Sequence, residues 1–373
     1  MRKKIGDFGF KIIVGAVAVV IFASAIYYAN DGFQKPYEEQ NNHHETARVV
    51  EILRADVEVT EDGFYSGEML LIVEIETGRY QGARTEVIYF LNQNADQPLE
   101  IDDRVAVLMS IVNSELISIN IQNPERREVV FGFFAIFLLA LSILGGKRGV
   151  LAMMSLVFTL TCITFLLIPL MLRGYPVVLT TFLILTLVTI VSLTFLAGLG
   201  TKGISAMIGC LIGVMATAML THFGGTVAHI SGFQTEEVGL LLATTDFPQG
   251  QVSGLFISGV LIASIGAVMN TALTIASTIH ELRENNPKMT VGRLFRSGMR
   301  VGRDWVGTMT CTLILAFVGT SLSMIILIYS QGTSVNQLIN SDFVMIEIIR
   351  SIAGSLGIIL TIPAVAFVSS VMD

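Results

Sequence analysis

The chain has 373 residues, of which 53% are hydrophobic and 14% are charged, with a formal net charge of -7. Soluble globular domains carry roughly 25% charged residues, so this composition excludes an ordinary soluble protein and predicts a polytopic membrane protein with one more polar segment. The three cysteines all lie in apolar runs, which excludes a disulfide framework and a Cys-x-x-Cys metal site. We therefore expect no metal and no cofactor.

The N-terminus has the pattern of a signal-anchor or of a signal peptide. Basic residues precede the apolar run at residues 12–29, and Ala23-Ser24-Ala25 resembles a cleavage site. The apolar run continues through Tyr27 and Tyr28, as aromatic residues do at a membrane interface, which favours a retained anchor. Residues 1–30 are predicted to form an N-terminal transmembrane signal-anchor, with the following segment outside the cytoplasm.

Residues 31–128 are predicted to form an extracytoplasmic β domain. Five β-patterned runs are separated by Gly, Asp, Asn and Pro, at residues 47–53, 68–75, 84–91, 104–111 and 116–121. This spacing indicates a small all-β fold, an OB-like barrel or sandwich. His43 and His44 lie in a predicted polar linker without the further ligands that a metal site needs. The interleaved basic and aromatic residues of a nucleic-acid binder are absent, so no nucleic-acid partner is expected.

Residues 129–373 are predicted to form a seven-helix membrane domain, because about 20 apolar residues span a bilayer as a helix. The predicted spans are residues 129–146, 150–172, 177–200, 203–223, 252–279, 305–329 and 343–372. With the N-terminal anchor, the fold class is a membrane α-helical bundle of about eight transmembrane helices with an inserted β domain. Lysines and arginines at residues 147, 148, 202 and 283–303 place those loops and both termini in the cytoplasm. The loop at 224–251 is predicted to be a short helix on the outer surface or a re-entrant segment.

Two consecutive spans carry stripes of small and polar residues at helical spacing. Such stripes are typical of closely packed helix pairs, and an amide in lipid is costly unless it has a partner. The pattern therefore leaves two alternatives, a packed helix pair or a polar path for a substrate or ion. The candidates for lining such a path are Asn270, Thr274 and Ser277 in the first span and Asp304, Thr308 and Thr312 in the second.

The segment between these spans, residues 280–304, is predicted to be an Arg-rich amphipathic cytoplasmic connector lying in the membrane interface. Thr290 is placed to cap its helix, and Arg300 and Asp304 are spaced to form an i,i+4 ion pair. The arginines either fix topology and bind lipid headgroups, or act in gating or anion binding. The interfacial and gating candidates are Arg293, Arg296, Arg300 and Arg303.

The last span contains two charged residues, Glu347 and Arg350, which are one helical turn apart and are spaced to pair. Both side chains either extend to the outer interface or face the interior of the bundle. A charged residue inside a membrane bundle is a functional candidate by default, so both are added to the path candidates.

Three stretches resemble the YibE/F family of bacterial multi-pass membrane proteins: GAVMNTALTIASTIHEL, SGMRVGRDWVGTMTCTLILAFVGTSL and EIIRSIAGSLGIILTIPAVA. In the β segment, GRYQGARTEVIYFLN and IDDRVAV resemble the extracytoplasmic portion of the family. The resemblance implies an aspartate where this chain has Asn270, so a proton or cation role of that aspartate would not carry over unchanged. The resemblance supports the architecture and implies no established activity.

Enzyme motifs are missing, since His280-Glu281 lacks the second histidine of HExxH and no Walker A, GxSxG or GxGxxG context occurs. We expect no enzymatic activity. The sequence predicts a transporter or permease-like protein of the bacterial cell membrane that moves a small solute or ion without hydrolysing ATP itself. The alternative is a membrane-anchored binding or assembly module whose β domain recruits a cell-envelope partner. The expected partners are membrane lipids and a cell-envelope protein or further copies of the chain.

Overall fold

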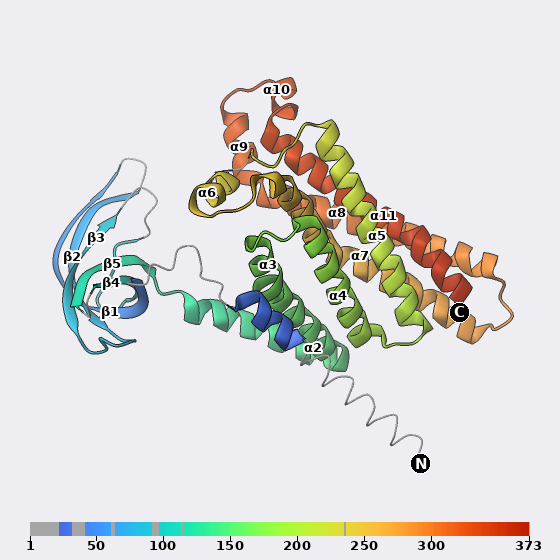
Figure 1. The fold of residues 1–373 in the computed structure, drawn as a ribbon, viewed down its shortest axis with the longest axis horizontal. Helices are drawn as coiled ribbons and strands as arrows, with labels where there is room; N and C mark the ends of the chain where they lie inside the picture. Colours follow the sequence, from blue (N-terminus) through green and yellow to red (C-terminus); the bar gives the residue numbers. More distant parts are fainter. Residues whose placement is uncertain are drawn as a thin grey trace, which may run out of the picture. The chain divides into compact units, whose positions relative to one another are not determined.

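The computed structural model describes residues 22–31, 42–60, 64–91, 97–112, 115–234 and 236–372. The chain divides into two compact units, Gln34–Ala140 and a helical unit of Met1–Phe33 with Leu141–Asp373 (Figure 1). The apolar run at 12–29 falls largely outside the described residues, which include only its helical end at residues 22–30. The predicted anchor over residues 1–30 therefore remains a prediction.

The first unit contains a five-stranded antiparallel sheet that curls into a half-barrel, so the all-β prediction for this segment is confirmed. Its strand order is β3-β2-β1-β4-β5. The long strand β1 pairs with β4 along its first part and with β2 along most of its length, through two register shifts. The strands are β1 (Asn42–Val59), β2 (Tyr65–Ile75), β3 (Arg84–Leu91), β4 (Arg104–Val112) and β5 (Glu115–Pro124).

The prediction of a polar linker around His43 and His44 is wrong. Both residues belong to β1, where they pair with Met109 and Leu108 of β4, and both are exposed. Backbone pairing with β4 makes the early part of β1 a strand despite its polar sequence. Among the described residues, no group of three or more His, Cys, Asp and Glu side chains could hold a metal ion.

Six helical stretches in the described part of the chain are long and apolar enough to cross a membrane, which is the pattern of a multi-pass membrane protein. They are Arg127–Leu172, Val177–Ala197, Thr201–Val227, Gln249–Asn285, Val291–Thr320 and Asp342–Met372. The helices in chain order are α2 (Arg127–Cys162), the π-helix η1 (Ile163–Leu167), α3 (Ile168–Leu172), α4 (Val177–Ala197), α5 (Thr201–Val227), α6 (Glu236–Thr244), the 3-10 helix η2 (Gln249–Gln251), α7 (Val252–Asn285), α8 (Val291–Thr320), α9 (Leu322–Ser330), α10 (Val335–Ile339) and α11 (Asp342–Met372).

The first of these stretches is 46 residues long and corresponds to two predicted spans. It is interrupted at Gly146, whose φ of 53° and ψ of -136° are not helical. Glycine adopts a positive φ without the steric cost that a Cβ imposes. Beside the break, Gly149 lies so close to the carbonyl of Leu141 that a Cβ would overlap it. The chain therefore changes direction sharply at this point.

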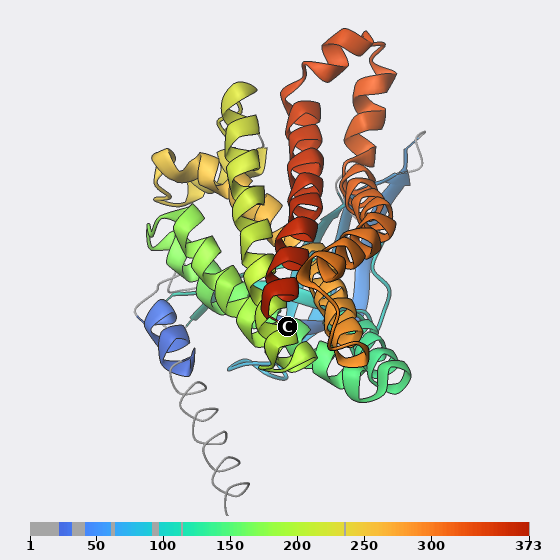
Figure 2. The ribbon, with the colours of Figure 1, turned by 90° about the vertical axis from the view of Figure 1, so that its right-hand side faces the viewer.

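The centre of the helical unit is the packing of α11 against α5, α7 and α8, with α4 covering α5 and α7 (Figure 2). Small residues bring α5 and α11 close together, since a Cβ added at Gly209 would overlap Val365 and one at Gly213 would overlap Thr361. A Cβ at Gly357 would likewise overlap the Thr217 hydroxyl. Without a hydrophobic effect to drive helices together in lipid, such close backbone approach is a main source of helix association.

Contacts define two opposite ends of the helical unit. At one end, the Tyr28 and Tyr175 hydroxyls are 3.1 Å apart, and Gln251 donates to the carbonyl of Gly174 at 3.0 Å. The hydrogen bond to Tyr28 raises the pKa of Tyr175. At the other end, Arg148, Lys202 and Glu284 line one cavity. The loops therefore alternate between two ends along the chain.

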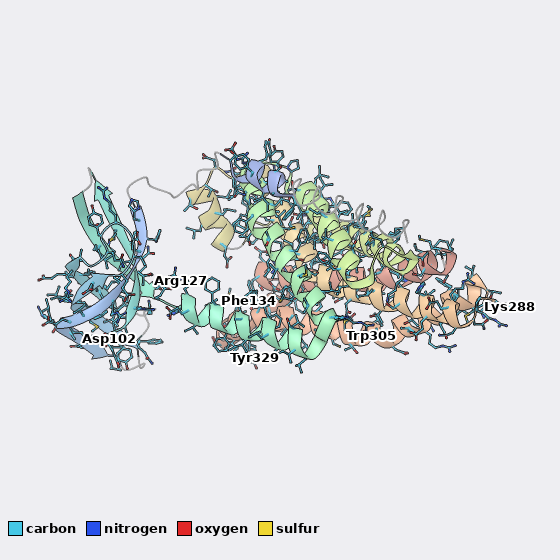
Figure 3. All side chains as sticks on the ribbon, turned by 90° about the horizontal axis from the view of Figure 1, so that it is seen from below. Asp102, Arg127, Phe134, Lys288, Trp305 and Tyr329 are labelled. Atoms are coloured by element: carbon cyan, nitrogen blue, oxygen red, sulfur yellow. The ribbon has the colours of Figure 1, made fainter. Side chains whose placement is uncertain are left out.

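The prediction of a separate Arg-rich connector helix differs from the structure. Helix α7 continues to Asn285 and α8 begins at Val291, so the four arginines occupy the first half of a helix that continues into the next span. Figure 3 labels Lys288 at the tip of the α7–α8 hairpin and Trp305 farther along α8. Thr290 is the N-cap of α8, but its side chain makes no capping hydrogen bond. The loop at 224–251 contains the short helix α6, and whether it lies on the outer surface or is re-entrant stays a prediction.

Candidate functional site

The apolar segments of the packed helices contain a single pair of strongly charged residues. Residues 177–197, 203–227, 252–279, 305–320 and 343–372 include no Asp, Glu, Lys or Arg except Glu347 and Arg350 of α11. The one histidine in these segments is His222 on α5, which is exposed. Since a charge inside a membrane span is costly, the position of this pair in the bundle decides whether it has a function.

Glu347 and Arg350 form an ion pair in the interior of the bundle. Arg350 Nη1 donates to Glu347 Oε1 at 2.8 Å, and the two side chains are 28% and 16% exposed, respectively. The guanidinium carbon lies 5.8 Å from the ring centre of Phe256 on α7 and 6.0 Å from that of Phe317 on α8. The negative faces of these rings stabilise the cation. Of the two positions considered from sequence, the partly buried Arg350 side chain beside these two rings favours the one facing the bundle.

The ion pair is only partly satisfied. Glu347 Oε2 and Arg350 Nε are both buried and have no hydrogen-bond partner among the described residues. A largely apolar cavity of about 250 Å³ adjoins the pair, lined by Glu347, Ser321 and Ser351 together with apolar side chains of α8, α9 and α11. A buried polar group without its partner is costly, and this cavity gives the Glu347 side chain room to move.

Buried hydroxyl groups lie farther along the centre of the bundle from this pair. Thr217 of α5 and Thr361 of α11 are fully buried and donate to the carbonyls of Gly213 and Gly357 in their own helices. The hydroxyls of Ser355 and Thr271 are buried without any partner among the described residues. The sequence analysis did not single out Thr217, Thr271 or Thr361, although Gly and Thr at spacings of four residues in α5 and α11 are a signal for Thr217 and Thr361.

A second, polar cavity of about 560 Å³ lies at the other end of α7. Ser277 is the one predicted path residue in its wall. His280 Nδ1 is 3.5 Å from the Thr201 hydroxyl, and His280 Nε2 is 3.6 Å from Glu284 Oε1. From Phe256 to Ser277, α7 rises roughly 30 Å at about 1.5 Å per residue, so the two cavities lie about one bilayer apart. The lining residues are Arg148, Leu151, Leu196, Lys202, Leu273, Ser277, His280, Glu281 and Glu284.

The remaining path candidates lie on the outside of the bundle. Asn270, Asp304, Thr308 and Thr312 are exposed, and Thr274 is half-buried. The Asn270 amide has only a weak contact, 3.9 Å to the sulfur of Met309, which joins the polar stripe of α7 to the side of α8. The Thr274 hydroxyl donates to the Asn270 carbonyl at 2.9 Å, within the same helix. The structure therefore does not bring these side chains together with Glu347 and Arg350.

The four arginines of the predicted gating set, Arg293, Arg296, Arg300 and Arg303, are also exposed. The structure describes both Arg300 and Asp304, and these two side chains do not form the predicted i,i+4 ion pair. Leu294, Gly298 and Gly302 on the opposite side of α8 are buried. The amphipathic pattern is thus real, but its apolar side packs on the bundle.

The family model described as YibE/F-like protein matches residues 133–372, which include all of these helices from α4 to α11. The chain belongs to the YibE/F-like family. The match begins after the β strands, so the resemblance of the β segment to this family stays a prediction. No curated protein and no solved structure matches the chain. Membership in the YibE/F-like family therefore accounts for the helical region and assigns no activity to it.

Proposed function

We propose that this protein is a permease that moves a small solute or ion across the cell membrane without hydrolysing ATP itself. The observation that carries the proposal is the Glu347–Arg350 pair, the one pair of strongly charged residues in the packed spans, held between two aromatic rings. Buried ion pairs are poor stabilisers, because desolvation offsets their attraction. A buried pair with unsatisfied atoms is better explained by a role in transport than by stability.

The proposed path follows the centre of the bundle along α7. It runs from the Glu347–Arg350 pair past the buried hydroxyls of Thr217 and Thr361 to the polar cavity at Ser277. Polar and ionisable groups within spans that face the bundle interior are typical of substrate and ion pathways. The closely packed centre between the two cavities corresponds to a closed state, and transport requires α11 to move against α5 and α7.

The proposed topology has eight spans, with both termini in the cytoplasm. The break at Gly146 divides the first 46-residue stretch into two spans. The anchor predicted from sequence at residues 1–30 would supply the eighth. Arg148 and Lys202 share one end of the bundle, as the positive-inside rule requires of cytoplasmic loops. Cysteines introduced as Lys147→Cys and Gly250→Cys should react with an impermeant thiol reagent from opposite sides of the membrane. Reaction from the same side would contradict the eight-span path.

A flux assay with the purified full chain in proteoliposomes tests the permease. A panel of inorganic ions and small metabolites should include at least one that the wild type moves. Ser277→Leu places a large apolar side chain in the wall of the polar cavity and should reduce that flux, because the cavity narrows. Gly259→Ala is the matched control, since an added Cβ there meets open space. A wild type that moves nothing, or equal fluxes in the two variants, would contradict the proposal.

A binding or assembly module is the second candidate, and one feature of the β unit favours it. An open cavity of about 800 Å³ in this unit is lined by Phe64, Tyr65, Arg104 and Glu125 among others. Aromatic and charged side chains around one concave surface are typical of a binding site. Thr46 donates to Glu125 Oε2 at 3.1 Å and so fixes one wall.

Affinity capture from membranes distinguishes this candidate. A stoichiometric cell-envelope partner that is lost on deletion of residues 46–122 and on Phe64→Ala would favour the module. Ile101→Ala is the control, because Ile101 is exposed in the same unit and does not line the cavity. Capture that is unaffected by Phe64→Ala would exclude this cavity as the binding surface.

A further inference from the structure

We propose that Arg350 is the binding site for a small monovalent anion, and that Glu347 is a tethered carboxylate that occupies this site when no anion is bound. The inference names the substrate class of the proposed permease and rests on that function only for the transport step. It is carried by the isolation of the pair, by its unsatisfied atoms and by the adjoining cavity.

The argument begins with the charge balance of the bundle. Helices α7 and α8 contribute phenyl rings to the surroundings of Arg350 and have no charged side chain within residues 252–279 and 305–320. From α5, residues 203–227 contribute no carboxylate; their ionisable groups are the buried thiol of Cys210 and the exposed His222. Glu347 is therefore the carboxylate that neutralises Arg350. If Glu347 is protonated or moves away, a buried cation remains without a counter-charge, which is strongly unfavourable.

The geometry allows this exchange. One carboxylate oxygen of Glu347 accepts from Arg350 Nη1, whereas Arg350 Nε is buried and without a partner among the described residues. A guanidinium offers five N–H donors in a fixed fork, so an anion can use donors that Glu347 leaves free. The neighbouring cavity of about 250 Å³ is lined by Glu347 and mostly apolar side chains, and it leaves room for the displaced Glu347 side chain. The anion then takes the place of the Glu347 carboxylate at Arg350.

The exchange fixes a stoichiometry. In the resting pair, the carboxylate of Glu347 and the guanidinium of Arg350 sum to zero charge. Binding one proton to Glu347 and one monovalent anion to Arg350 again gives zero, so the site takes up the two together. A divalent anion, or an anion without the proton, would leave a net negative charge inside the bundle. The small monovalent anion is thus the class that this site fits, taken up with one proton.

The buried hydroxyls farther along α11 and α5 are compatible with this class. Ser355 Oγ is buried without a partner in the described part of the chain, and hydroxyl groups donate to anions. At the other end of the bundle, Arg148 and Lys202 contribute positive charge to the polar cavity, beside Glu281 and Glu284. Ser355 is therefore one further buried donor beyond Arg350 on α11.

Binding can be measured without transport. The full chain in lipid nanodiscs is unfolded by heat at constant ionic strength while gluconate, a bulky anion, is replaced by formate, nitrate or chloride. The wild type should be stabilised by a small anion more strongly as the pH is lowered, because the site takes up a proton together with the anion. Glu347→Gln keeps Arg350 but removes its carboxylate, and should bind the same anion at least about tenfold more tightly at neutral pH, because the buried cation then has no counter-charge. Arg350→Gln should show no stabilisation by the small anion.

Asp304→Asn is the matched control, since Asp304 is an exposed acid on α8, and its anion dependence should equal that of the wild type. If Arg350→Gln does not fold, Glu347→Gln still decides the matter, because it retains the cation. A Glu347→Gln variant that does not distinguish the small anions from gluconate would overturn the site. Flux of a cation or neutral solute with no anion binding would refute the site and leave the permease standing. Anion binding without any flux would support the site and contradict the permease.

Discussion

The interior pair Glu347–Arg350 and the outer stripe that runs through Asn270 and Asp304 are both polar features in apolar spans, yet they have opposite surroundings. The pair lies between Phe256 and Phe317 in the bundle. Asn270 and Asp304 are exposed on α7 and α8. The comparison teaches that helical spacing shows which residues share a face of a helix, but does not show where that face points.

Removing one charge should give the largest difference in stability between variants of the two regions. Arg350→Gln leaves Glu347 as an uncompensated charge in the bundle, and should lower the free energy of unfolding by about 3 kcal/mol, as for other broken buried pairs. Asp304→Asn changes an exposed residue and should stay within about 0.5 kcal/mol of the wild type. Denaturant unfolding in detergent measures both.

The double variant Glu347→Gln with Arg350→Gln provides the control for this prediction. Since it removes both charges together, it should recover most of the stability lost in Arg350→Gln alone. Equal losses for Arg350→Gln and Asp304→Asn would show that the pair is as well solvated as the outer stripe, and would remove the basis of the proposed site.

Glycine substitutions give the next largest contrast. A Cβ added at Gly209 would lie 2.9 Å from the Cα of Val365, which cannot move independently of the α11 backbone. Gly209→Ala should therefore cost about 2 kcal/mol by overpacking. At Gly266, on the outer face of α7, an added Cβ meets nothing within 4 Å. Gly266→Ala should be neutral or stabilising by up to ~1 kcal/mol, because alanine favours the helix.

The same unfolding assay measures this pair of variants, both of which add one methyl group to a glycine in a span. If Gly266→Ala were as damaging as Gly209→Ala, the outer face of α7 would be covered in the folded protein. That result would indicate that Asn270 is buried against another protein chain. It would support the substrate or ion path that the sequence predicts between α7 and α8.

Much of the architecture follows from the sequence. Long apolar runs predict the membrane helices, because hydrophobic length alone decides whether a segment can span a bilayer. The strands follow from short alternating runs, and all five predicted strands overlap observed ones. The start of β1 could not be predicted, because His43 and His44 become strand residues only through pairing with β4.

The site was harder to predict for a physical reason. In a membrane both sides of a helix are apolar, so hydrophobicity does not distinguish the buried side from the lipid-facing side. The faces that bury α5 and α11 carry Gly209, Gly213 and Thr361, and the outer face of α7 carries Gly266 and Asn270. These stripes have the same composition. Only contact with neighbouring helices distinguishes them, and a single sequence does not contain that information.

Substitutions in the outer stripe should change the transport rate only slightly. The sequence pattern predicts that Asn270 and Asp304 line the path, whereas their exposed positions predict that they do not. Asn270→Leu combined with Asp304→Ala should keep flux within about twofold of the wild type and stability within about 0.5 kcal/mol, as for other surface changes. The proteoliposome assay compares it with Ser277→Leu. Complete loss of flux in the double variant would place the path on the α7–α8 face.

Thiol labelling should distinguish inside from outside with the least disturbance. Cys311 on the outer stripe is exposed, whereas Cys162 and Cys210 are buried in the described structure. N-ethylmaleimide should therefore modify one cysteine per folded chain in detergent and three after denaturation, counted by intact mass. Cys311→Ser should abolish the modification of the folded chain. Rapid modification of Cys210 would show that the packing around Thr189, its 3.9 Å neighbour, opens readily. Protection of Cys311 would show that the outer stripe is covered, because a thiol must be accessible to react.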